Sequence, residues 1–182
     1  MDARVLRGDS RGATRSIGGQ ATRSRTITWQ DPLASATVGA QMAGLDYVRA
    51  IQSGEVPPPP IAAVMNFSIA EFEEGKAVFI GEPGEEHYNP IGVVHGGYAS
   101  TILDSALGCA VHTTLPAGVG YTSQTLEVKY LRPITRETGA VRSEAEVIHR
   151  GRKTATAEAR LTSVETGKLL ATGTSTCLIL TP

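Results

Sequence analysis

Apolar and polar residues alternate through most of the last third of the chain. The two-residue period is clear over 125–130, 141–147 and 154–161, and a more continuous apolar run follows at 170–180. Side chains of a strand point alternately to its two faces, so this period predicts strands with one buried face. Short turns separate the runs, which predicts a consecutive antiparallel meander of four strands.

A helical period replaces this alternation in the middle of the chain. Between His95 and about Thr113 apolar residues recur mostly every three or four positions, which predicts a helix with one buried face. Several of its residues are Gly or Ala, and small side chains let a sheet approach closely. The run ends before Leu-Pro-Ala-Gly at 115–118, a helix stop. Ahead of this helix, branched and aromatic residues predict two strands, 61–71 and 76–81, with a turn between them.

The N-terminal part of the chain has a different character. Over 31–53 apolar residues recur at three- to five-residue intervals, which predicts a helix that Gly54 ends. Four prolines at 57–60 then form a stiff connector. Residues 1–28 hold six arginines among Gly, Ser and Thr, so we expect a mobile tail, with an Arg- and Ser-rich transit peptide as the alternative.

The elements of the main domain follow the order strand, strand, long helix, four strands. A single helix on one face of an antiparallel sheet buries both apolar surfaces. We therefore expect an α+β fold in which a long helix packs on one face of an antiparallel sheet of five to six strands. The expected organisation is a basic tail over 1–30, a helical extension over 31–56 and the main domain over 57–182.

The composition limits the range of functions. A chain of 182 residues with a net charge of −1 suits one domain and does not indicate nucleic-acid binding. The sequence contains no secretory signal, no apolar run of membrane length and neither common phosphate-binding glycine motif. Cys109 and Cys177 share no motif with each other or with a histidine, so we expect reduced thiols, no zinc site and a cytoplasmic protein.

Candidate chemistry gathers where the long helix should begin, in the run Asn-Pro-Ile-Gly-Val-Val-His-Gly-Gly at 89–97. Free N–H groups and partial positive charge in a first helical turn would let a carbonyl oxygen bind beside Gly96 and Gly97 as negative charge develops on it. The two glycines also suit a tight loop-to-helix turn. His95 is a donor, a base or, as we favour, a helix cap, and Asn89 either orients water or caps the loop.

Two further features have both a functional and a structural interpretation. Asp104 lies among apolar residues of the helix, where a buried carboxylate is costly unless it is paired. It is therefore a functional acid or a residue at the exposed edge of the helix. Arg150-Gly151-Arg152-Lys153 gathers three positive charges at one predicted turn, which suits a phosphorylated ligand or a solvated hairpin.

The order of these motifs resembles the PaaI-like branch of the hotdog-fold thioesterases. The shared features are Asn-Pro-x-Gly-x-x-His-Gly-Gly, an Asp nine positions after the His, Tyr-Leu-Arg-Pro at 130–133 and His-Arg-Gly-Arg at 149–152. The resemblance extends from about Pro57 to Leu180. It implies a hotdog fold, in which the antiparallel sheet is curved and wraps the long central helix, and hydrolysis of acyl-CoA thioesters with aryl or medium-chain acyl groups. The CoA belongs to the substrate, and no cofactor or metal is expected.

The resemblance also implies roles for the site residues. Asp104 corresponds to the catalytic carboxylate, acting as general base or as nucleophile. Gly96 corresponds to the residue whose N–H polarises the thioester carbonyl, with Gly97 beside it. Asn89 corresponds to the loop residue that positions the water or the thioester, and His95 to the residue that supports the carbonyl-binding turn.

Three further expectations follow from the resemblance. Ser123, or its neighbour Thr122, corresponds to a hydroxyl residue that holds the water. The turn Arg150-Gly151-Arg152-Lys153 contacts the CoA phosphates. Protomers pair by joining their sheets edge to edge, commonly into tetramers of two dimers, so that Asp104 of one chain faces Asn89 and Gly96 of the other.

Two other functions are compatible with the same fold. One is hydration of enoyl thioesters, which usually depends on a His with an Asp or Glu in a different motif. The other is a non-catalytic module that binds acyl-CoA, with the basic tail as a partner-binding arm.

Overall fold

The computed structural model of the protein describes residues 21–181, so predictions about residues 1–20 lie outside the described part. Its helices and strands are α1 (Pro32–Gly39), α2 (Gly44–Ser53), α3 (Pro60–Met65), β1 (Phe67–Glu73), β2 (Lys76–Gly81), the 3₁₀ turn η1 (Glu85–His87), α4 (Gly96–His112), β3 (Gly120–Tyr130), the 3₁₀ turn η2 (Arg136–Thr138), β4 (Val141–Arg150), β5 (Thr154–Ser163) and β6 (Leu169–Leu180). None of the helices in this part combines the length and the apolar character that crossing a membrane requires.

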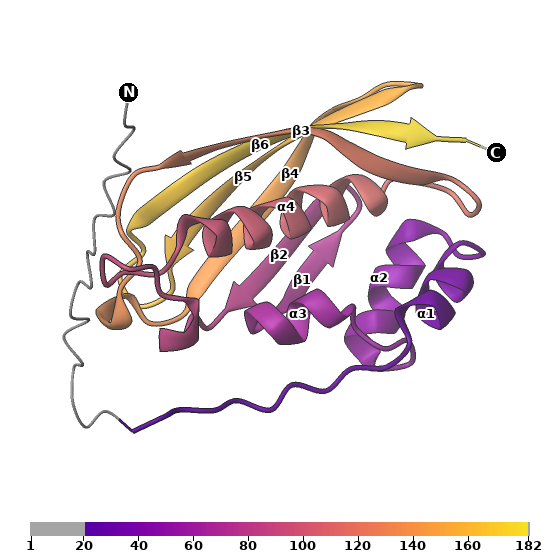
Figure 1. Ribbon diagram of the computed structural model, residues 1–182. Coiled ribbons are helices and arrows are strands. Elements are labelled where there is room, and N and C mark those ends of the chain that lie inside the picture. The colour runs from indigo at the N-terminus through magenta and orange to yellow at the C-terminus, as the bar shows by residue number, and fades with distance from the viewer. Residues whose placement is uncertain (1–20, 182) are drawn as a thin grey trace, which may run out of the picture.

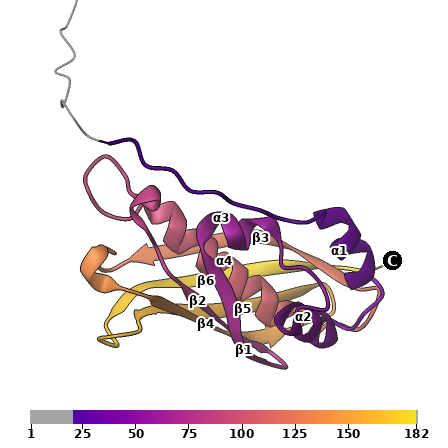
Figure 2. The same ribbon diagram turned by 90° about the horizontal axis from the view of Figure 1, so that it is seen from below.

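The six strands form one antiparallel sheet in the order β1-β2-β4-β5-β6-β3, and α4 lies across one face of it (Figure 1). The four α-helices lie on the same side of the sheet, with α2 and α3 beside α4 near β1 (Figure 2). This arrangement confirms the expected α+β hotdog fold. Strand β3 is an edge strand, because its backbone pairs with β6 alone.

Helix α4 forms the centre of the core. Its sheet-facing side chains are fully buried, and they include Ile102, Leu103, Ala106, Leu107 and Ala110. They pack against the buried alternate residues of β4, β5 and β6, which are small, and the short side chains of both layers let helix and sheet approach closely. The predicted limits of this helix are confirmed, since His95 is its N-cap and Thr113 its C-cap.

Two predictions, one about the helical extension and one about the start of the main domain, are wrong in detail. Residues 31–53 form two helices with a break at 40–43, where Gly44 begins the second helix and donates its N–H to the Leu115 carbonyl at 2.9 Å. Residues 60–65 are the helix α3, although a strand was expected from Ile61. Pro60 occupies the first helical position, where its fixed φ angle fits and its missing N–H has no cost. Asn66, at φ 53°, then ends the helix.

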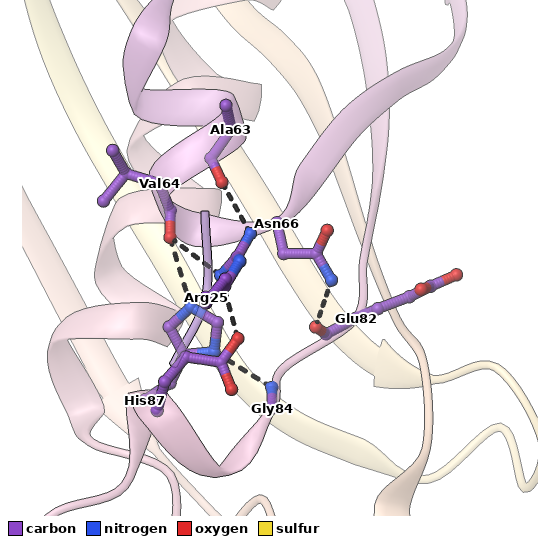
Figure 3. A network of polar contacts seen from close by, with 8 residues as sticks. Arg25, Ala63, Val64, Asn66, Glu82, Gly84 and His87 are labelled. Atoms are coloured by element: carbon purple, nitrogen blue, oxygen red, sulfur yellow. Dashed lines mark hydrogen bonds and ion pairs between the residues drawn. The ribbon is translucent and has the colours of Figure 1, made fainter. Parts of the chain in front are cut away.

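The segment 21–30 has no helix or strand and runs past α3 as an extended chain (Figure 1). Arg25 attaches it to the main domain. Its guanidinium donates to the Ala63 carbonyl at 2.7 Å, to the Val64 carbonyl at 3.3 Å and to Glu86 Oε1 at 2.8 Å (Figure 3). The two carbonyls belong to the last turn of α3, where backbone acceptors have no helical partner. Arg25 therefore joins the N-terminal segment to α3 and to the loop after β2.

The same network continues through His87 toward the start of α4. His87 Nδ1 accepts from the Gly84 N–H at 2.9 Å, and Nε2 lies 3.4 Å from the Val64 carbonyl that also binds Arg25 (Figure 3). The backbone carbonyl of His87 accepts from the His95 N–H at 2.8 Å. Arg25 and His87 thus tie the loop that leads into α4 to the last turn of α3.

Replacing Arg25 with Ala should destabilise the fold by about 1 kcal/mol, because charge-assisted bonds to helix-end carbonyls are lost at a partly exposed position. Chemical denaturation measures this change, and amide hydrogen exchange should rise over 84–95. Arg23→Ala is the matched control, since Arg23 forms only an exposed ion pair with Glu85 among the described contacts. Equal effects of the two substitutions would contradict the proposed anchoring.

Candidate active site

Asp104 lies half-buried on α4, on the side of the helix that faces the edge strand β3. Ser123 of β3 donates its hydroxyl to Asp104 Oδ1 at 3.1 Å. A bulge interrupts the pairing of β3 with β6 directly after Ser123, and bulges of this kind commonly re-aim a side chain beside a site. Neighbouring Thr122 points to the opposite face of the strand by the alternation of β-structure. The structure thus brings two predicted site residues, Asp104 and Ser123, into contact.

Burial raises the pKa of Cys109 and of Tyr121, two groups whose charges interact with that of Asp104. Removal from bulk water, and then the negative charge of Asp104, raise the pKa of the Cys109 thiol to about 12. Burial likewise raises the pKa of the Tyr121 hydroxyl well above its ordinary value. Both groups are therefore protonated near neutral pH, and Cys109 is a poor nucleophile because a thiol reacts as its thiolate.

Asn89 shapes the loop before α4. Its Oδ1 accepts from the backbone N–H of Ile91 at 3.0 Å and of Val93 at 3.4 Å. The Asn89 N–H donates in turn to the Val93 carbonyl at 2.9 Å. Asn89 is therefore a loop cap, one of its two predicted roles, and its side-chain NH₂ takes no part in these bonds.

His95 caps α4, as the sequence favoured. Its Nδ1 accepts from the Gly97 N–H at 2.8 Å, which places the ring proton of the neutral form on Nε2. The Tyr98 N–H donates to the His95 carbonyl at 2.9 Å. Among the hydrogen bonds within residues 21–181, the Gly96 N–H donates to no protein acceptor. Of the two glycines, Gly96 therefore offers the available donor at the helix N-terminus.

A cavity of about 330 Å³ opens at this end of α4. Its lining includes Asn89, His95 and Gly96 together with the segment after β3, namely Tyr130, Leu131, Arg132, Pro133 and Ile134. Tyr130 was recognised in the sequence only as part of a motif. Its ring lies against Gly96, where a Cβ atom would approach the ring to 3.1 Å, so the absence of a side chain at Gly96 makes room for it.

The predicted residues form three separate groups within one chain, namely Asp104 with Ser123, the residues at Gly96 and the basic turn. Asp104 follows Gly96 by eight positions, about 12 Å along a helix, and it does not line the cavity at Gly96. The basic turn 150–153 is exposed and lies at the sheet end where β3 begins, since Ala155 and Ser123 both pair with Cys177. Gly96 lies at the other end, beside Tyr130 where β3 stops. One chain therefore does not bring the basic turn, Asp104 and Gly96 together.

A second cavity lies on the far side of the helix. It measures about 490 Å³, and its lining is mostly apolar, with residues from α2, α3, β1 and β2 and with Cys109 of α4. Helix α2 of the N-terminal extension provides Val48 and Ile51 on one side. Within residues 21–181 no group of three or more His, Cys, Asp or Glu side chains is arranged to hold a metal ion.

Comparison with known proteins gives the chain a family. Residues 91–170 match the family model described as Thioesterase superfamily. Acyl-coenzyme A thioesterase 13 of Homo sapiens is 32% identical over 102 residues, which cover 56% of this chain and 71% of that protein. The 1,4-dihydroxy-2-naphthoyl-CoA hydrolase of Listeria monocytogenes serotype 1/2a (strain 10403S) is 30% identical over 107 residues, which cover 58% of this chain and 84% of that protein.

Solved structures of similar proteins point to the same family. A phenylacetic acid degradation-related protein from Ralstonia eutropha JMP134 superposes with a TM-score of 0.67 at 29% identity, covering 72% of this chain and 98% of its own. The phenylacetic acid degradation protein PaaI from Thermus thermophilus superposes with a TM-score of 0.60 at 28% identity, covering 66% and 98%. With its central helix, its sheet order and these relatives, the chain belongs to the thioesterase superfamily, as a PaaI-like enzyme with the hotdog fold.

Proposed function

We propose that the protein hydrolyses acyl-CoA thioesters to a free acid and CoA. The observation that carries this proposal is the contact between Asp104 and Ser123. The same helix begins at Gly96, whose N–H is free and lies at a cavity. The names of two relatives, an acyl-coenzyme A thioesterase and a CoA hydrolase, support CoA as the thiol. The proposed reaction needs water and no cofactor or metal.

The thioester carbonyl is proposed to bind at the Gly96 N–H. Because the Gly97 N–H already donates to His95 Nδ1, Gly97 shapes the turn and Gly96 supplies the donor. Negative charge that develops on the carbonyl oxygen would meet the positive end of the α4 dipole, an arrangement typically worth about 10²–10³-fold in rate for one donor. The unused NH₂ of Asn89 is a second candidate donor at the same cavity.

Asp104 is proposed to activate water as a general base or to attack the carbonyl directly. Ser123 has a single proton and donates it to Asp104 Oδ1, so its oxygen remains able to accept from a bound water. A water held between Asp104 and Ser123 would be positioned by the Ser123 oxygen and would have the Asp104 carboxylate as its proton acceptor. General-base catalysis typically contributes about 10²–10⁴-fold.

The active site is proposed to form between two protomers. Strand β3 has 11 residues and one unpaired edge, and such edges are usually covered or paired. Antiparallel pairing of two copies of β3 about a two-fold axis would reverse the direction of the partner helix. Asp104 of one protomer would then face Gly96 and Asn89 of the other, and two such dimers would form the tetramer.

The same two-fold axis gives the basic turn a role. The turn with Arg150, Arg152 and Lys153 lies at the end of the sheet opposite Gly96 in its own chain. In the antiparallel dimer, the end of one sheet where β3 begins would lie beside the end of the partner sheet where β3 stops. The basic turn of one protomer would therefore flank the Gly96 cavity of its partner. We therefore propose that these three exposed charges contact the CoA phosphates.

The acyl group is proposed to be aryl or of medium length. Two similar proteins support the aryl alternative, because one is named a 1,4-dihydroxy-2-naphthoyl-CoA hydrolase and another a phenylacetic acid degradation protein. The mostly apolar cavity of about 490 Å³ that Cys109 of α4 helps to line is the proposed space for such a group.

Asp104→Asn should lower kcat at least about 10²-fold while the fold stays intact, because the amide can neither accept the water proton nor attack as an anion. Spectrophotometric release of free CoA from aryl, short, medium and long acyl-CoA thioesters measures it. Glu158→Gln, which removes an exposed carboxylate on β5, is the matched control. Near-normal turnover of Asp104→Asn would remove this residue from the mechanism.

Mixing two inactive variants tests the intersubunit site. Asp104→Ala and Gly96→Val each damage a different half of the proposed site, and the Val side chain would crowd the Tyr130 ring in the cavity at the helix N-terminus. Random assembly makes half of the dimers mixed, each with one intact site of two, so co-refolded variants should regain about a quarter of wild-type activity. Activity that stays at the level of the separate variants would show that each site lies within one chain.

Replacing Arg150, Arg152 and Lys153 together with Ala should raise KM for acyl-CoA roughly tenfold with little change in kcat, because the contact stabilises substrate and transition state alike. Steady-state kinetics against the matching acyl-pantetheine thioester, which lacks the nucleotide phosphates, should show no change in KM. Arg160→Ala, an exposed charge in the middle of β5, controls for net charge. An equal rise in KM for both thioesters would exclude phosphate recognition by the turn.

A further inference from the structure

Tyr130 places a hydroxyl directly beside the carbonyl-binding end of α4. It is the last residue of β3 and lines the cavity that also contains Asn89 and Gly96. A Cβ atom on Gly96 would lie 3.3 Å from the Tyr130 hydroxyl oxygen. The side chain nevertheless remains 57% exposed, so the core does not need it and its hydroxyl can be reached by a ligand.

The Tyr130 hydroxyl lies against the hydroxyl of Ser100. The two oxygens are 2.6 Å apart, and either can be the donor of this hydrogen bond. Ser100 has one proton, and it also meets the geometry for donating to the Gly96 carbonyl at 3.2 Å, one helical turn back. When Ser100 donates to that carbonyl, Tyr130 donates to Ser100. The Tyr130 oxygen then has a free acceptor position at the cavity, and an N–H group is the partner that suits it.

The proposed substrate has such a group at a suitable place. In a CoA thioester the sulfur is followed by two methylene carbons and then by the first amide N–H of the pantetheine arm. When Gly96 holds the carbonyl oxygen, this amide is the first hydrogen-bond donor of the thiol that passes through the cavity. We propose that Tyr130 accepts a hydrogen bond from this amide and so selects thioesters of amide-bearing thiols over simple thioesters. This inference rests on the proposed acyl-CoA hydrolysis.

Tyr130→Phe separates this contact from the rest of the site, because it keeps the ring against Gly96 and removes only the oxygen. Three thioesters of one acid are compared, with CoA, with N-acetylcysteamine and with ethanethiol as the thiol. The first two contain the amide and the third does not. Loss of one neutral hydrogen bond should lower kcat/KM roughly 2- to 10-fold for the first two and leave the ethyl thioester unchanged.

Two control variants sharpen the comparison. Tyr47→Phe removes another tyrosine hydroxyl, one bound to the Ser35 carbonyl away from this cavity, and should leave all three thioesters unaffected. Ser100→Ala removes the partner of Tyr130 and keeps its oxygen, so the preference for amide-bearing thiols should persist. A uniform loss for all three thioesters in Tyr130→Phe, or no loss for any, would overturn the inference.

Binding provides a readout that does not depend on turnover. Calorimetric titration with an S-alkyl-CoA thioether, which has the pantetheine arm and no scissile bond, should show roughly 2- to 10-fold weaker binding to Tyr130→Phe than to the wild type. Equal affinities would overturn the role of Tyr130 even in an active thioesterase. Absence of CoA release by the wild type from every acyl-CoA would instead overturn the proposed function.

Discussion

The packing of α4 against the sheet is the interaction on which the rest of the structure depends. One side of this helix is apolar and fully buried, and the small side chains that face it from β4, β5 and β6 fix how close the two layers lie. The helix has no freedom to slide or rotate without opening this contact. Because Gly96 begins the helix and Asp104 lies two turns further on, the core also sets where the Gly96 N–H and the Asp104 carboxylate are presented.

The site combines three kinds of local structure around this rigid element. A cap at His95 leaves one N–H free, a bulge in β3 directs Ser123 to Asp104, and a loop tied by Asn89 forms a wall of the cavity. None of these features alone distinguishes an enzyme from an ordinary turn. Their arrangement in a member of the thioesterase superfamily is what supports hydrolysis. In such a reaction water is the reactant, and the protein positions it and stabilises developing charge.

Sequence reasoning succeeded where one period extended over many residues. The helix from His95 to Thr113 and strands β4, β5 and β6 were predicted to within about three residues at each end, because burial against a single partner imposes a clear pattern. Strand β3 begins five residues before its predicted start at 125, and the buried face expected for it is largely exposed in this chain. Sequence reasoning failed at 61–65, where branched residues indicated a strand and the preceding prolines in fact begin a helix. Short segments of this kind are decided by their neighbours in space, which local propensity does not contain.

The same limit applies to the candidate site. Asp104, Asn89 and Ser123 were identified from the family resemblance, whereas the hydrogen bond between Ser123 and Asp104 is seen only in the structure. The role of Tyr130 required the positions of Ser100 and Gly96, residues 30 and 34 positions away in the sequence. Arg25 likewise shows its function only through carbonyls of α3 that no pattern links to it.

The position of β3 at the edge of the sheet has an evolutionary consequence. In the proposed dimer this one strand provides the pairing surface, the hydroxyl beside the acid and the tyrosine beside the helix start. Substitutions in β3 that weaken the association of the protomers would then also lower the catalytic activity. Sequence change along β3 is therefore limited by both requirements. A lineage of such proteins would find few routes to an active monomer, and self-association and turnover would be inherited together.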